Sequence, residues 1–170
     1  MGISALRYLD NEILCVIDSV FAGKKISEVS IIKKDIPVVE DINKAKAMGA
    51  NVLLLGVLTS GGVRPNSWNN VIKEALNQGM SIINGLHDQV YPDFSKYLTD
   101  KTQWIWDTRV PQFVPKIGSA KAINLSNKRV LMIGTDMAAG KMTVGLELYS
   151  YLKEKHINTG FVATGQVGIT

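Results

Sequence analysis

Short runs of apolar, β-branched residues recur along the chain and alternate with segments of helical periodicity. The runs lie at 13–17, 52–57, 81–84, 104–106, 130–133 and 161–163. Two helices are predicted between them, one capped by Asp41 and extending to residue 48, the other beginning at Ser67 and extending to residue 78. A glycine follows each helix directly. Buried strands separated by helices are typical of a parallel sheet, so the pattern predicts an α/β fold.

The periodicity fades between residues 109 and 128, where prolines and a glycine interrupt a polar stretch. We place a domain boundary in this stretch, which divides the chain into domains 1–118 and 119–170. The second domain begins with a predicted strand at 129–133, continues with a loop and a helix at 140–155, and returns in a strand at 160–163. The helix has one apolar face, so the segment is predicted to be a βαβ unit.

Both ends of the chain are abrupt. Residues 3–9 are predicted to be the end of a helix with no strand before it, and the chain stops just after the loop at 164–168. Two strands and one helix cannot bury both faces of a parallel sheet. We therefore expect a fragment that lacks the first strand of its first domain and most of its second domain.

The strongest chemical signal lies at residues 134–143, Gly-Thr-Asp-Met-Ala-Ala-Gly-Lys-Met-Thr, between a predicted strand and a predicted helix. Glycines allow a tight turn that directs backbone N–H groups at one point, and the helix N-terminus adds a partial positive charge. Lys141 adds a full charge. The sequence therefore predicts a phosphate-binding loop, whose ligand-binding residues are Gly134, Thr135, Asp136, Gly140, Lys141, Met142 and Thr143.

This loop deviates from the usual pattern G-x(4)-G-K-[ST] in two ways. Gly134 stands one position early, and Met142 occupies the place of the hydroxyl that holds magnesium in nucleotide hydrolases, with Thr143 as the nearest substitute. We therefore favour phosphate binding without phosphoryl transfer. Phosphoryl transfer, and a glycine-rich turn that only caps a helix, remain as alternatives.

A second glycine cluster follows the run at 52–57, and ligands of open α/β sheets collect at the carboxyl ends of strands. Gly61 and Gly62 are candidate substrate-binding residues, and Arg64 could clamp a substrate carboxylate through two hydrogen bonds. A turn and a solvated arginine are the structural alternatives.

Two further strand ends carry candidate residues. His87 follows the run at 81–84 and is a candidate catalytic base, because imidazole titrates near neutral pH; a histidine that only binds local backbone groups is equally compatible. Asp18 follows the run at 13–17 and is a candidate substrate-binding residue, although a turn or helix cap is the more common role.

The composition narrows the function classes. The net charge of +4 is spread along the 170 residues, which disfavours nucleic-acid binding. The longest apolar runs fall well short of the ~20 residues of a membrane-spanning helix, and no signal peptide is visible, so a cytoplasmic location is predicted. With two histidines and one cysteine, we predict no metal site. A small molecule is the expected partner, and a homo-oligomer remains open.

Residues 134–136 with 140–143, and Phe-Val-Ala-Thr-Gly-Gln-Val-Gly-Ile at 161–169, resemble the D-glutamate N-acetyltransferase family. The Gly61-Gly62 cluster and Ser-Ile-Ile-Asn-Gly-Leu-His at 81–87 extend the resemblance over nearly the whole chain. It implies a Rossmann-like parallel sheet domain, then the start of a P-loop NTPase-like α/β domain. It also implies acetyl transfer from acetyl-CoA to D-glutamate, an activity that we do not expect of the fragment alone.

Two other functions stay open. The Gly134-Thr135-Asp136 opening also resembles the loop of dethiobiotin synthetase, which implies an ATP-dependent ligase or kinase with ATP and magnesium as cofactors. Met142 disfavours that function. The third hypothesis is a non-catalytic nucleotide-binding module.

Overall fold

The computed structural model describes residues 2–57, 59–111, 113–114, 117–136 and 139–163. The chain divides into two compact units, Met1–Arg109 and Val110–Ile169. Each unit is described by itself. The elements of the first unit are α1 (Gly2–Tyr8), β1 (Val16–Ile17), α2 (Ile26–Val29), β2 (Val38–Val39), α3 (Ile42–Ala47), β3 (Val52–Leu55), η1 (Ser60–Gly62), α4 (Trp68–Asn77), β4 (Ser81–Asn84), α5 (Tyr91–Phe94), η2 (Ser95–Tyr97) and β5 (Ile105–Asp107).

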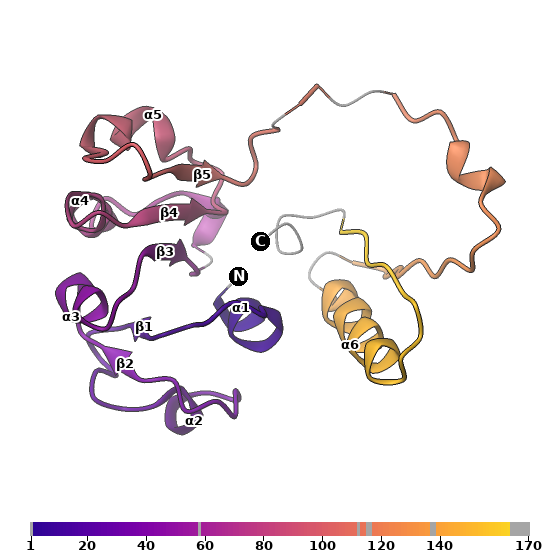
Figure 1. Cartoon of the computed structure of the whole chain (residues 1–170), viewed down its shortest axis with the longest axis horizontal. Helices are drawn as coiled ribbons and strands as arrows, with labels where there is room; N and C mark the ends of the chain where they lie inside the picture. The colour runs from indigo at the N-terminus through magenta and orange to yellow at the C-terminus, as the bar shows by residue number, and fades with distance from the viewer. Residues whose placement is uncertain (1, 58, 112, 115–116, 137–138, 164–170) are drawn as a thin grey trace. The chain divides into compact units, whose positions relative to one another are not determined.

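The described strands β1–β5 of the first unit pair in parallel. β3, β4 and β5 form a sheet in that order, and β1 pairs with β2. Figure 1 shows the arrowheads of β3, β4 and β5 at the same end of the sheet. The register places Leu55 beside Asn84 and Asn84 beside Asp107, so the three strands finish level with one another. The loops that follow them therefore leave from one edge.

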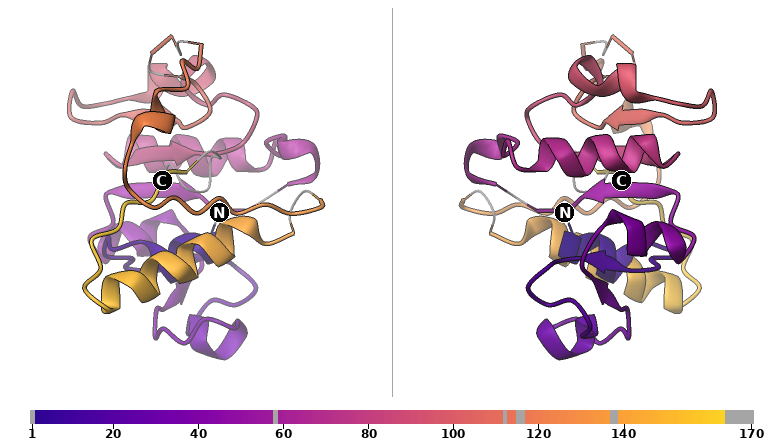
Figure 2. Two further views of the ribbon diagram at one scale, coloured as in Figure 1. Left: turned by 90° about the vertical axis from the view of Figure 1, so that its right-hand side faces the viewer. Right: turned by 90° about the vertical axis from the view of Figure 1, so that its left-hand side faces the viewer.

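Helix α4 covers one face of this sheet (Figure 2). Its Ile72 and Leu76 are fully buried and pack in one cluster with Ile82 of β4 and Ile105 of β5. Burial of an aliphatic side chain stabilises a fold by roughly 1.5–3 kcal/mol, so this cluster holds the strand ends in place. Neighbouring residues of the strands alternate to the other face, where Ile83, Trp104 and Trp106 line an apolar depression.

A second cluster lies under the shorter sheet. Leu6 of α1 packs with residues of α2 and β2, and the backbone N–H of Gly2 donates to the carbonyl oxygen of Gly56 at 2.7 Å. Cys15, directly before β1, is half-buried, and this burial raises the pKa of its thiol. The thiol is therefore held in its neutral form and packs as a small apolar group.

The sequence pattern predicts the longer elements of the first unit well. β4 coincides with the predicted run at 81–84, whereas β1 keeps only Val16–Ile17 of the run at 13–17. Asp41 caps α3 as predicted, since its side chain accepts from the backbone N–H of Lys44 at 2.9 Å. Ser67 precedes α4, but its side chain forms no cap bond to any described residue, because its own backbone is already helical.

The second unit contains η3 (Lys121–Asn124) and α6 (Lys141–Glu154), the helix predicted at 140–155. The predicted strands at 129–133 and 160–163 are wrong, since its described residues contain no strand. Val130, Leu131 and Ile133 are 71–82% exposed. A strand needs a hydrogen-bonded neighbour, and the described residues of this unit offer none.

The chain after α6 turns back along the helix. Phe161 packs beside Gly145, where a Cβ atom would approach its ring to 3.2 Å, and its ring centroid lies 5.7 Å from that of Tyr149. Residues 164–170, which carry part of the resemblance noted above, lie outside the described residues. No helix in the described ranges is long and apolar enough to cross a bilayer.

Candidate functional site

The loops after β3 and β4 meet at the carboxyl edge of the sheet and bring predicted residues together. The backbone N–H of His87 donates to the carbonyl oxygen of Gly62 at 2.9 Å. The backbone N–H of Arg64 donates to Oδ2 of Asp88 at 2.8 Å. Two loops that are 24 residues apart in the chain are thus joined by hydrogen bonds.

Gly62 and His87 are in direct contact. Gly62 has a φ of +67°, a left-handed backbone conformation that residues other than glycine rarely adopt. A Cβ atom at this position would lie 2.2 Å from Cδ2 of His87. Glycine is therefore required here both by the backbone and by the imidazole ring, which packs against it while the side chain remains exposed to solvent.

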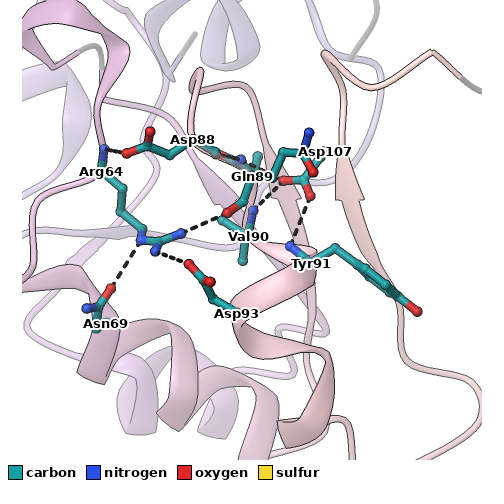
Figure 3. A network of polar contacts seen from close by, with 9 residues as sticks. Arg64, Asn69, Asp88, Gln89, Val90, Tyr91, Asp93 and Asp107 are labelled. Carbon is teal, nitrogen blue, oxygen red and sulfur yellow. Dashed lines mark hydrogen bonds and ion pairs between the residues drawn. The ribbon is translucent and has the colours of Figure 1, made fainter.

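Arg64 uses its whole guanidinium group inside the protein (Figure 3). Nε donates to Asn69, Nη1 to the carbonyl oxygen of Gln89, and Nη2 to Asp93 at 2.7 Å. The group also lies 4.8 Å from the centre of the Phe94 ring. Through these contacts, Arg64 links α4, the loop after β4 and α5. Its predicted role as a carboxylate clamp would require displacement of Asp93.

A buried carboxylate holds the other side of the same loop. Asp107, at the end of β5, accepts hydrogen bonds from the backbone N–H groups of Val90 and Tyr91 at 2.8 and 2.9 Å (Figure 3). It also accepts one from the side-chain amide of Asn84 at 2.7 Å. Asn84 is 0% exposed and Asp107 is 7% exposed. A buried carboxylate is tolerated when donors surround it, so this network stabilises the start of α5.

Asp18 forms a local turn after β1. Its Oδ1 accepts from the backbone N–H groups of Val20 and Phe21 at 2.9 and 3.1 Å. Asp18 therefore forms the turn that the sequence analysis gives as its more common role. Substrate binding by Asp18 stays a prediction.

The glycine loop of the second unit leads into α6 through Gly140, whose φ is +88°. No described residue caps the helix with its side chain, and a Cβ atom at Gly140 would have no neighbour within 4 Å among the described atoms. Lys141 folds its aliphatic stem against Gly134 and donates from Nζ to the backbone carbonyl of Asp136. Thr135, Asp136 and Thr143 are exposed, and Met142 is partly buried.

The described residues around the start of α6 have features of an anion-binding loop. A helix N-terminus that no described side chain caps presents N–H donors and a partial positive charge, and the ammonium of Lys141 lies beside Asp136 of the same loop. The open space at Gly140 lets an anion approach the backbone closely. No group of three metal-ligating side chains is present within the described part of the chain.

Comparison with known proteins assigns the chain to a family. Residues 19–111 match the model described as the Rossmann-like domain of DUF1611, and residues 116–170 match the model described as its P-loop domain. The chain belongs to the DUF1611 family. Its fold class is therefore that of a Rossmann-like domain followed by a P-loop domain, as the sequence predicts.

Several known proteins are similar over most of the chain. A protein named D-glutamate N-acetyltransferase from a Pseudoalteromonas species is 35% identical over 130 residues, and one of the same name from Tritonibacter scottomollicae is 34% identical over 130 residues. The matches cover 75% of this chain but 39% and 38% of those proteins. A crystal structure of a DUF1611 protein from Anabaena variabilis has a TM-score of 0.86 at 37% identity, over 99% of this chain and 49% of that one. The chain thus spans half or less of the length of these relatives.

Three further residues lie at this edge that the sequence pattern does not predict: Asp107, Thr108 and Arg109. Asp107 completes β5, and Thr108 donates its backbone N–H to the carbonyl oxygen of Asn84 at 2.9 Å. Arg109 donates from Nε to the carbonyl oxygen of Gly85 at 2.9 Å. Polar residues directly after a strand were a visible signal, but residue 109 also opens the irregular stretch that marks the domain boundary.

Proposed function

We propose that the full-length protein carrying this chain is an N-acetyltransferase that uses acetyl-CoA and acts on D-glutamate. The observation that carries the proposal is the N-terminus of α6, which no described side chain caps, with Lys141 beside it, in a chain whose relatives bear that enzyme's name. Coenzyme A carries several phosphate groups, and such a loop suits one of them. D-glutamate is proposed as the acceptor because the two relatives are named D-glutamate N-acetyltransferase.

The chain's own residues take separate parts in this proposal. The coenzyme supplies an acetyl group activated as a thioester. In the second unit, the backbone N–H groups at the start of α6 and the ammonium of Lys141 bind a phosphate, and Thr143 adds a hydroxyl. Met142 leaves no hydroxyl at the magnesium position, which favours binding over phosphoryl transfer.

His87 is the proposed general base. Attack on the acetyl carbon requires a neutral amine, so the ammonium of the acceptor must first lose a proton. In this proposal the exposed imidazole, which packs against Gly62 and whose backbone N–H bonds to Gly62, accepts that proton. The amide bond then forms as the thioester C–S bond breaks, and the sulfur leaves as a thiol after protonation.

Lys141→Ala in the full-length protein tests the phosphate site. Loss of a charge-assisted hydrogen bond costs about 1.5–3 kcal/mol, so the Kd for acetyl-CoA should rise about tenfold or more in calorimetry. Lys153→Ala is the matched control, because Lys153 is an exposed lysine at the other end of α6. An unchanged Kd in Lys141→Ala would refute the assignment of the loop.

Assays of the full-length wild-type protein distinguish the proposed acetyltransferase from the two alternative functions. A ligase or kinase, favoured by the Gly134-Thr135-Asp136 opening, would release ADP from ATP in a magnesium-dependent reaction. A nucleotide-binding module would bind its ligand with no turnover. Acetylation of D-glutamate from acetyl-CoA, with no ADP release, is the outcome expected from the proposal.

A further inference from the structure

We infer that Arg109, assisted by Thr108, binds a carboxylate of the acceptor amino acid at the carboxyl end of β5. The inference rests on the proposed function and names the part of the first unit that would hold the acceptor. It assigns to Arg109 the role that the sequence alone suggests for Arg64.

Arg109 has hydrogen-bonding capacity that the described residues do not use. Its side chain is partly buried, and Nε is occupied by the carbonyl oxygen of Gly85 at 2.9 Å. To the residues that the structure describes, Nη1 and Nη2 make neither a hydrogen bond nor an ion pair. A guanidinium that is partly removed from water is stabilised by a paired anion, and two terminal nitrogens match the two oxygens of one carboxylate.

Arg64 lies at the same edge and differs in this respect. All three of its guanidinium nitrogens donate to protein acceptors, and its side chain is 11% exposed. A carboxylate ligand would have to replace the bond to Asp93, which already supplies the same chemical group. Between the two arginines, only Arg109 can accept a carboxylate without breaking a contact among the described residues.

Thr108 provides an independent sign of an incomplete polar site. The residue is 6% exposed, and its Oγ1 is the buried side-chain oxygen that lacks a hydrogen-bond partner in the described part of the chain. A buried hydroxyl without a partner costs free energy, and such groups often mark functional positions. Protein atoms cover this oxygen, so a ligand reaches it when the turn after β5 shifts on binding. A carboxylate could then accept from Thr108 and from Arg109.

The position suits the reaction. Gly85, which holds Nε of Arg109, lies two residues before His87 in the loop after β4. A carboxylate bound by Arg109 would therefore place the rest of a short amino acid near the loop that carries the proposed base. A carboxylate and an amine of one small molecule would be bound by neighbouring loops of the same unit.

The test measures binding of D-glutamate to the full-length protein by calorimetry, without acetyl-CoA, for wild type and for Arg109→Lys. Lysine keeps the charge but not the two-pronged geometry, so the Kd should rise about tenfold or more. Arg7→Lys, an exposed arginine of α1, is the matched control and should leave the Kd unchanged. Equal Kd values for wild type and Arg109→Lys would overturn the inference.

Thr108→Val separates a ligand contact from a structural role. Replacing an unpartnered buried hydroxyl by a methyl group should preserve or raise the unfolding temperature of the protein without ligand. The inference expects the Kd for D-glutamate to rise in the same variant. A higher unfolding temperature with an unchanged Kd would remove Thr108 from the site.

Two further measurements are needed. One distinguishes a substrate carboxylate from a coenzyme phosphate as the ligand of Arg109, and the other distinguishes failure of this inference from failure of the proposed function. If Arg109→Lys raised the KM for acetyl-CoA and left that for D-glutamate unchanged, Arg109 would bind a coenzyme phosphate and the inference would be wrong. If wild type bound D-glutamate through Arg109 but transferred no acetyl group to it, the proposed function would fail while the carboxylate site stood.

Discussion

At the scale of single residues, the tightest constraint in the first unit is the contact between Gly62 and His87. Gly62→Ala should place a methyl carbon 2.2 Å from Cδ2 of His87 and force a side chain into a φ of +67°. The left-handed backbone alone costs roughly 1–2 kcal/mol and overpacking adds about 1–3 kcal/mol. We expect the free energy of unfolding, measured in urea, to fall by more than about 2 kcal/mol.

Gly23→Ala is the matched control for this prediction. Gly23 has a φ of +87°, but a Cβ atom there would meet nothing within 4 Å among the described atoms. Its substitution should therefore cost only the backbone strain, roughly 1–2 kcal/mol. Equal losses for the two variants would show that the His87 ring does not pack against Gly62 in solution.

Residue chemistry predicts part of the site and not the rest. Gly62 and His87 come together because the carboxyl ends of parallel strands share an edge, and this rule needs only the order of strands and loops. The partners of Arg64 do not follow from that rule. They include Asp93, which lies in the four-residue helix α5 and has no periodic pattern in the sequence.

At the scale of elements, the two predicted helix caps should differ in their contribution to stability. Asp41→Ala removes a side-chain acceptor that bonds the backbone N–H of Lys44 at 2.9 Å, and should lower the free energy of unfolding by about 1 kcal/mol. Ser67→Ala removes no cap bond to a described residue and should be nearly neutral. Chemical denaturation of both variants measures the difference. A loss for Ser67→Ala as large as that for Asp41→Ala would contradict the capping geometry.

The elements also show where the sequence pattern stops being informative. β4 is bounded by Gly79 and Gly85 and is predicted to the residue. β2 consists of Val38–Val39 after a proline and before two acidic residues, so its apolar run is too short to be recognised as a strand. It becomes a strand because Val38 pairs with Val16, a contact that only the folded chain creates.

At the scale of the whole molecule, the two units differ in how completely their apolar segments are paired. In the first unit, Ile82 of β4 lies between two strands and is fully buried. In the second, Leu131 is 81% exposed although it belongs to an equally apolar run. The relatives are about twice as long as this chain or longer.

This difference predicts the pattern of backbone hydrogen exchange. In the chain of residues 1–170, the amides of 129–133 should exchange fast, because no strand pairs with them in the described residues. The amides of 81–84 should exchange slowly in the same sample, since β4 is hydrogen-bonded on both sides. If 129–133 pairs with further strands in a longer protein that carries this chain, its amides should become protected there, while those of 81–84 remain unchanged. Fast exchange of 129–133 in the full-length protein would show that this run never becomes a strand, and the loop at 134–143 would then lack the support that a phosphate-binding loop requires.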